Sequence, residues 1–207
     1  TTTDMDATGA QGAFVGSPKV LDQNTPNVVA AFQSHVNVGT NGSGSEKGLG
    51  ASEAALSPAM LAGANTGFLR SDARLYVVYV SHEEDSSASS PSQVQASITA
   101  AKGGDASQVF FAAIAGPEPL GCFNFSGSAD AGSRYIDVVD ATGGLFGSIC
   151  DADFGVTLQN LAFEVTAAGN NFPLTEIPEL ASIQVLIDGI PQATTTWIYS
   201  PTSTSIQ

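Results

Sequence analysis

The chain has 207 residues, of which 43% are hydrophobic, so it can fill the core of one full-sized domain. Six Lys and Arg residues against 20 Asp and Glu residues give a formal net charge of -14, which repels nucleic acids and anionic membrane surfaces. No long apolar run and no basic segment followed by an apolar one occurs, so neither a membrane span nor a signal peptide is predicted.

The composition is typical of an exported protein. Lysine is scarce, whereas serine, threonine, glycine and alanine are abundant, as in exported bacterial proteins. The chain opens at Thr1, without Met, in a segment with strand character, so we expect the numbering to begin inside a longer or processed precursor. We therefore expect an extracellular or cell-surface location, with the periplasm as the alternative.

The first predicted elements are two short strands, at residues 1–4 and 13–15, separated by a glycine-rich turn. A helix is expected next, because Thr25 can cap its amino end and Pro26 suits the first helical position. Apolar side chains then recur on one face until Val36, where this helix is expected to end.

A loop rich in glycine and hydroxyl residues leads into a second helix. Ser43 and Glu46 have the spacing of a capping box, so Ser43 is expected to cap this helix. Ser57 and Pro58 restart the helix for one more turn, which is expected to end at Gly63.

Residues 75–80 form a continuous apolar run, LYVVYV, which predicts a strand covered on both faces, as in a parallel sheet. This run is the best candidate for the central strand. It ends in Ser81, His82 and three consecutive acids at 83–85. Since ligands bind at the carboxyl ends of the strands in an open parallel sheet, this stretch is also a candidate site.

Strands and helices alternate after the acids. Ser90 and Gln93 have capping-box spacing around Pro91, and the helix that they begin is expected to run to about Lys102. A second buried strand at 108–115 completes a right-handed strand–helix–strand unit. The next predicted elements are a helix, a short strand and a longer helix, at about 135–142, 145–150 and 153–169.

The predicted fold class is α/β, with a Rossmann-like, mainly parallel sheet flanked by helices and a C-terminal β-hairpin appendage. The hairpin is indicated by alternation at 183–187, an Asp-Gly turn at 188–189 and a return at 197–199. We accordingly predict an α/β domain at 1–172 and a hairpin tail at 173–207.

Two cysteines, Cys122 and Cys150, are too far apart in sequence for a CxxC redox or zinc motif. A single disulfide is the interpretation that we favour, since it would close a loop of about 28 residues and contribute about 3 kcal/mol to stability. Two buried free thiols are the alternative.

Signatures of catalysis are weak. The sequence has no G-x-S-x-G nucleophile elbow and no Gly-Lys pair of a phosphate-binding loop, and two histidines are too few for a histidine zinc site. His35 falls on a predicted helix, where an ordinary surface or packing role is expected. A hydrolase would have to use His82 with Ser81 or Asp85, but neighbouring strand residues point to opposite faces. We therefore predict that the chain is not an enzyme.

Oxygen-bearing side chains in two predicted loops suggest a ligand site. Our candidate ligand contacts are Thr40, Ser43, Ser45, His82, Glu83 and Asp85. Hydroxyls and a carboxylate at neighbouring strand ends can hold Mg²⁺ and leave a coordination position for a partner's acid, with Ser43 as the candidate metal ligand. The alternative, which we favour for the chain alone, is that Ser43 only caps its helix and the acids are solvated.

Four stretches together resemble von Willebrand factor type A domains of exported bacterial proteins. They read TTTD, GSGSEKGLGASEAALSP, NTGFLRSDARLYVVYVSHEEDSS and RYIDVVDATGGLFGSICDADFG, and a W-x-Y hairpin follows them. The resemblance covers nearly the whole chain. It implies a Rossmann-like domain with a metal-ion-dependent adhesion site at the top of its sheet, where Mg²⁺ binds protein or matrix ligands without catalysis.

Two departures from the family affect this site. The family's first strand, with its Asp-x-Ser-x-Ser loop, would lie before Thr1. The hydroxyl ligand of the second loop corresponds to Ser43, with Thr40 and Ser45 as rivals, but His82 stands where the third loop has Asp. Because an imidazole is a poor Mg²⁺ ligand, we expect no cofactor, and Mg²⁺ only if the missing ligands are supplied.

The resemblance implies a non-enzymatic interaction or adhesion module that binds a protein ligand or a neighbouring subunit. The absent strand adds an alternative, because its removal leaves unpaired edges on neighbouring strands. In that alternative the chain is a structural subunit of an extracellular filament or homo-oligomer, completed by a strand donated in trans. Nucleic acids and a membrane span are not expected.

Overall fold

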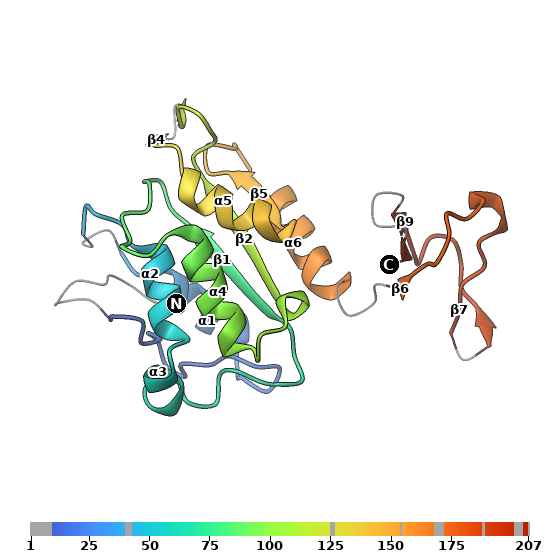
Figure 1. Ribbon diagram of the computed structural model, residues 1–207, viewed down its shortest axis with the longest axis horizontal. Helices are drawn as coiled ribbons and strands as arrows, with labels where there is room; N and C mark the ends of the chain where they lie inside the picture. Colours follow the sequence, from blue (N-terminus) through green and yellow to red (C-terminus); the bar gives the residue numbers. More distant parts are fainter. Residues whose placement is uncertain are drawn as a thin grey trace. The chain divides into compact units, whose positions relative to one another are not determined.

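The computed structural model describes residues 10–39, 43–124, 127–153, 155–167, 172–187, 189–200 and 205–206 (Figure 1). The chain forms two compact units, Thr1–Phe154 and Gly155–Gln207. The first has a parallel sheet with helices and the second has short antiparallel strands, so the predicted α/β class with a C-terminal hairpin is confirmed. The domain limits drawn from the sequence, 1–172 and 173–207, stay a prediction.

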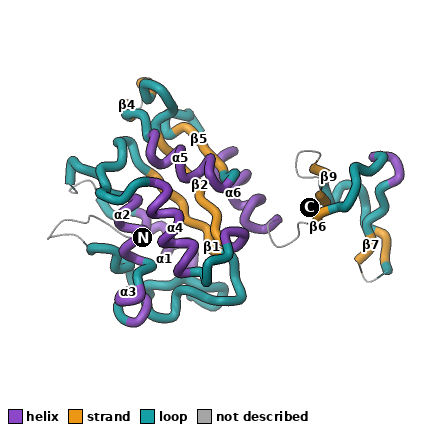
Figure 2. Tube along the Cα trace, in the orientation of Figure 1, coloured by secondary structure: helices purple, strands orange, loops and turns teal. Residues whose placement is uncertain are grey.

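A parallel sheet lies at the centre of the first unit, in the strand order β1-β2-β5 (Figure 2). Its strands are β1 (Leu75–Val80), β2 (Val109–Ala115) and β5 (Leu145–Ser148). Leu75 is opposite Val109, and Ala112 is opposite Leu145. Because all three strands run in the same direction, the loops that follow them emerge at one edge of the sheet.

Among the described strands the middle position belongs to β2, which corrects the prediction for Leu75–Val80. β2 is buried on both faces, since Phe111 and Ala112 are 1% and 4% exposed. In β1, Val78 and Val80 share a face and are 41% and 65% exposed. An apolar run identifies a strand, but it does not reveal the number of neighbouring strands, because these are distant in sequence.

Three helices cover one face of this sheet, namely α2 (Gly48–Ala55), α4 (Pro91–Ala101) and α5 (Ser133–Thr142). Leu49, Ile98 and Val138 of these helices join the same buried cluster as Tyr79 and Phe111 of the sheet. Each such side chain stabilises the fold by about 1.5–3 kcal/mol relative to full exposure. This apolar layer fixes the helices against the sheet and so positions the loops at its carboxyl edge.

Two predicted helix starts are confirmed by their caps. The Ser90 hydroxyl accepts a hydrogen bond from the Gln93 amide, and the Gln93 side chain accepts one from the Ser90 amide at 2.8 Å, which completes the capping box of α4. Ser57 caps α3 (Pro58–Ala62) and accepts from the amide of Met60.

Two other predicted starts are wrong. Helix α1 (Val28–Val36) begins later than Thr25, whose hydroxyl accepts from the Asp22 amide at 2.9 Å and closes a turn. The Ser43 hydroxyl accepts from the Ser45 amide at 3.1 Å, and α2 begins further along the chain. In both places a local side-chain to backbone hydrogen bond competes with the expected helix cap.

The strand predictions at the amino end and after β2 also need correction. Residues 13–15 form no strand, and the Phe14 amide donates to the Asn65 side chain instead. The predicted strand at 1–4 lies outside the described residues. Between β2 and α5, where no strand was predicted, the chain forms an antiparallel hairpin made of β3 (Cys122–Asn124) and β4 (Gly127–Ala129).

The second unit begins with the predicted helix, α6, and continues in short strands. Its elements are α6 (Gly155–Ala167), β6 (Phe172–Pro173), β7 (Leu186–Ile187), β8 (Ile190–Pro191), β9 (Tyr199–Ser200) and β10 (Ser205–Ile206). Ile187 pairs with Ile190, whereas Tyr199 pairs with Ile206, so the predicted hairpin return at 197–199 is wrong. The predicted helix end at 169–170 and Asp188 lie outside the described residues.

Asn65 is the buried polar side chain that holds the amino-terminal loop to the helical layer. It is 1% exposed and makes three hydrogen bonds to backbone groups. Its amide nitrogen donates to the carbonyls of Gly12 and Ala55 at 2.8 and 2.9 Å, and its oxygen accepts from the Phe14 amide at 2.8 Å. Both donors and the oxygen of its side chain are therefore bonded to the backbone of other segments.

We expect Asn65→Ala to lower the free energy of unfolding by about 2–4 kcal/mol, because three buried backbone groups lose their partner. Urea unfolding followed by circular dichroism would measure the change. The matched control is Thr66→Ala at the neighbouring exposed position, with an expected change within about 0.5 kcal/mol. Equal stabilities for the two variants would contradict this role.

Candidate functional site

The loop that follows β1 crosses the carboxyl edge of the sheet and leads to α4. Ser81 continues the strand pairing, because its amide donates to the Ile114 carbonyl at 3.1 Å. The Ser86 amide donates to the Glu46 carbonyl at 2.7 Å, which brings this loop beside the segment that precedes α2. The two loops that the sequence singled out are therefore neighbours in space.

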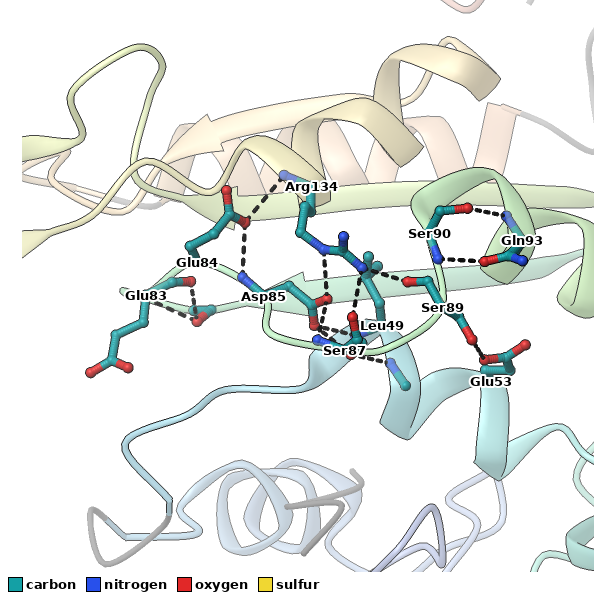
Figure 3. Close-up of polar contacts among 12 residues, drawn as sticks. Leu49, Glu53, Glu83, Glu84, Asp85, Ser87, Ser89, Ser90, Gln93 and Arg134 are labelled. Carbon is teal, nitrogen blue, oxygen red and sulfur yellow. Dashed lines mark hydrogen bonds and ion pairs between the residues drawn. The ribbon is translucent and has the colours of Figure 1, made fainter.

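Asp85 is the most buried charged group of this region, with a side chain that is 0% exposed. Its Oδ1 accepts hydrogen bonds from the Leu49 amide at 3.0 Å and the Ser87 hydroxyl at 2.8 Å. Its Oδ2 accepts from the Ser87 amide and from Nε of Arg134, both at 3.0 Å (Figure 3). Both carboxylate oxygens are thus bound by the protein itself.

The first turn of α2 is capped by side chains from other elements. The Leu49 amide donates to the Asp85 carboxylate at 3.0 Å, and the Gly50 amide donates to the Ser87 hydroxyl at 2.8 Å. A helix amino end attracts negative charge and hydrogen-bond acceptors, so the Asp85 carboxylate suits this place. The cap that the sequence assigned to Ser43 is therefore supplied by a loop more than 30 residues further along the chain.

Arg134 joins the start of α5 to the same loop. Its guanidinium pairs with Asp85 and also donates to the carbonyls of Ser87, at 3.0 Å, and Ser89. Glu84 completes the connection, since its Oε1 accepts from the amides of Arg134 and Asp85 at 3.2 and 2.8 Å. One cation thereby ties α5 to the loop and, through Asp85, to α2.

Glu53 extends this network along the surface of α2 towards α4. Its two carboxylate oxygens each accept a hydrogen bond at 2.7 Å, one from the Ser89 hydroxyl and one from the Ser97 hydroxyl. Figure 3 shows Ser89 between Glu53 and the Arg134 side chain. The serine-rich segment after the acids therefore links neighbouring helices through hydrogen bonds.

Two tyrosines line the interior beside this network. Tyr79 and Tyr135 are 5% and 1% exposed, with ring centroids 5.2 Å apart. The Ser52 hydroxyl donates to the Leu49 carbonyl, so Tyr79 donates to Ser52 at 2.8 Å. Burial raises the pKa of both phenols well above the ordinary value, and the hydrogen bonds at their hydroxyls oppose the rise only partly.

The remaining predicted ligand contacts lie at the surface. The His82 side chain is 62% exposed, and its Nε2 lies 3.6 Å from a carboxylate oxygen of Glu83. Ser43 and Ser45 are joined by their own hydrogen bond, and Thr40 lies outside the described residues. Ligand contact by these residues stays a prediction, while Asp85 is engaged by the fold.

Ser81, which a hydrolase could use with His82, lies in a turn after β1. The Ser81 hydroxyl donates to the Glu83 carbonyl and accepts from the Glu83 amide, so it is held in a turn rather than paired with His82. Within the described part of the chain, no group of three or more His, Cys, Asp and Glu side chains could hold a metal ion.

The predicted disulfide is confirmed and links the loops after β2 and β5. Cys122 of β3 is bonded to Cys150, which follows β5 directly. The Asn124 side chain adds a hydrogen bond to the Cys150 carbonyl at 2.5 Å. The Asp130 amide donates to the His82 carbonyl at 2.9 Å, so the loop after β1 joins the same surface.

Sequence reasoning missed Arg134 and the β3–β4 hairpin. A possible signal for Arg134 was the scarcity of cations, since a lone Arg at a helix start in a strongly acidic chain calls for a special partner. The hairpin carried no such signal, because its strands are only three residues long.

Comparisons with protein-family models, with curated proteins and with solved structures found no match for this chain. Among the described residues there is also no helix with the length and apolar character that a membrane crossing requires. The functional assignment therefore rests on the site.

We expect Arg134→Met to lower the free energy of unfolding by about 3–5 kcal/mol, because it leaves the Asp85 carboxylate buried without its cation. Urea unfolding would measure this loss, with Arg70→Met at an exposed position as the control, expected to change stability by about 0.5 kcal/mol or less. Adding Asp85→Asn to Arg134→Met should recover part of the loss, since the buried charge is then removed. A mild effect of Arg134→Met would show that the ion pair is dispensable.

The buried tyrosines predict a loss of stability at alkaline pH. Both pKa values are raised in the folded state, so their contribution is fully present below the unfolded value of about 10 and is lost as the pH rises beyond it. The free energy of unfolding should fall by up to about 1.4 kcal/mol per pH unit for each tyrosine. Urea unfolding between pH 8 and 11 should show a flatter profile for Tyr79→Phe combined with Tyr135→Phe; a profile parallel to that of the wild type would refute the assignment.

Proposed function

We propose that this chain is a non-enzymatic interaction module that binds a protein ligand through the loops at the carboxyl edge of its parallel sheet. The observation that carries the proposal is the buried Asp85–Arg134 network, which fixes these loops while leaving His82 and Glu83 at the surface. Loops held on a rigid scaffold are the usual carriers of binding residues. The resemblance to von Willebrand factor type A domains favours the same edge of the sheet.

An exported location is part of this proposal. The disulfide Cys122–Cys150 supports it, because disulfides persist in oxidising compartments outside the cytosol. The net charge of -14 supports a protein ligand over nucleic acids and anionic lipids. An extracellular or cell-surface setting fits both features, and the periplasm is the alternative.

Mg²⁺ is not required in this mode of binding. The residue that corresponds to the third-loop Asp of the family is His82, and the Asp85 carboxylate is occupied by protein donors. Ser43 remains the residue that would contact a metal if another chain or segment supplied the missing ligands.

We expect a photo-crosslinking amino acid to label the ligand from the carboxyl edge of the sheet and not from the opposite edge. It would be placed at the carboxyl-edge positions Ser45, His82 and Glu118 and at the control positions Asp72 and Ser107 near the amino ends of β1 and β2. All five positions are exposed or partly exposed. The labelled chain would be mixed with the secreted proteins of the source organism. Mass spectrometry would identify the labelled protein.

Labelling that survives chelation by EDTA would support the metal-independent mode. Labelling confined to the two control positions would refute the proposed site, and complete loss of labelling in EDTA would refute binding without a metal.

A second candidate function is favoured by the outer strand of the sheet. Within the described residues β1 is hydrogen-bonded to β2 alone, and its Val78 and Val80 side chains are 41% and 65% exposed. A strand added beside β1 would pair with the backbone groups of this edge and place its own side chains next to Val78 and Val80, as in filaments built by strand donation. Sedimentation of the purified chain over a wide concentration range separates the two functions, because only the filament subunit should self-associate.

A further inference from the structure

We propose that Leu120 and Phe123 form an apolar tip that enters an apolar pocket on the protein ligand, and that basic side chains border this pocket. This inference rests on the proposed function and identifies the chemistry of the partner. It is argued from the exposure of the tip, the way in which the fold holds it, and the charges around it.

The tip is the most exposed large apolar feature of the described chain. Leu120 and Phe123 are 90% and 87% exposed, although both belong to the well-packed first unit. Their side chains therefore add almost nothing to the core of the free protein. Large apolar side chains of this kind, when they are buried at the centre of an interface, supply most of its binding energy.

The fold holds the backbone of the tip in place. Phe123 follows Cys122, which is bonded to Cys150, and it pairs with Ser128 across the β3–β4 hairpin. The Gly121 amide donates to the Pro117 carbonyl at 2.8 Å.

Gly121 also has φ +73°, and a Cβ there would lie 2.0 Å from the Ala129 carbonyl oxygen, so the chain is pressed against β4. A backbone fixed before binding loses little conformational entropy in the complex, and this favours docking of the tip as a preformed anchor.

The charged side chains on the segments that carry and flank the tip are acidic. Glu118 and Asp130 are exposed and lie on either side of it in sequence, and the His82–Glu83 turn is hydrogen-bonded to Asp130. Residues 116–132 and 148–153 contain acids but no Lys or Arg. A pocket bordered by Lys or Arg complements this rim, whereas an anionic membrane is repelled by it.

The test uses a random dodecapeptide phage library selected on the full chain. Enriched peptides should combine Lys or Arg with large apolar residues, and their synthetic forms should bind Leu120→Ser/Phe123→Ser about tenfold or more weakly than the wild type. The matched control is Val29→Ser/Phe32→Ser, which removes two exposed apolar side chains of α1 and should leave the affinity unchanged. Affinity should also fall as salt is added.

Acidic or neutral enriched peptides, or equal binding to the tip variant and the wild type, would overturn the inference. Vesicles of phosphatidylcholine, alone or with phosphatidylglycerol, test whether the tip binds lipid instead. If the wild type binds the vesicles and the tip variant does not, the tip binds a membrane and the inferred protein pocket is refuted. Unchanged unfolding midpoints for both variants keep the comparison valid, as expected for exposed side chains.

Photo-crosslinking from position 82 separates this inference from the proposed function. Labelling of the ligand that is reduced in the tip variant supports both. Labelling that is undiminished in the tip variant refutes the tip while the interaction function stands, and no labelling from the carboxyl edge in either background refutes the proposed function itself.

Discussion

The carboxyl edge of the sheet depends on the Asp85 carboxylate, which lies buried at the amino end of α2 beside the Arg134 guanidinium. A buried carboxylate without partners would be very costly, so the amides of α2, the Ser87 hydroxyl and the cation are all needed together. These groups come from the loop after β1 and from two helices. Their mutual requirement fixes the three segments in one arrangement.

The same contact limits what this edge can do chemically. The open amino end of a helix is a ready site for an anion, but the Leu49 and Gly50 amides of α2 are already bound by Asp85 and Ser87. Ser81 is likewise held by Glu83. Because Asp85 and Ser81 are satisfied within the fold, the groups of this edge left for a partner are those at the surface, as the proposed binding role requires.

Several elements defined by local sequence were predicted correctly, although the helix start at Thr25 was not, and features that depend on distant residues were missed. The strand Leu75–Val80 and the caps at Ser57 and Ser90 follow from runs and spacings of a few residues, and the structure confirms them. The position of β2 in the middle of the sheet depends on pairing over more than 30 residues. The true cap of α2 could not be predicted for the same reason, since Ser43 offered a local alternative and Asp85 is remote in sequence.

Three loops at this edge behave as one surface because covalent and hydrogen-bonded links join them. The disulfide connects the loops after β2 and β5, and the bond from the Asp130 amide to the His82 carbonyl connects the loops after β1 and β2. Apolar anchors contribute affinity and a charged rim contributes rate and selectivity, so the two kinds of group are most effective when their spacing is fixed. The links fix that spacing before any ligand arrives, and this is the physical reason for proposing recognition at this edge of the sheet.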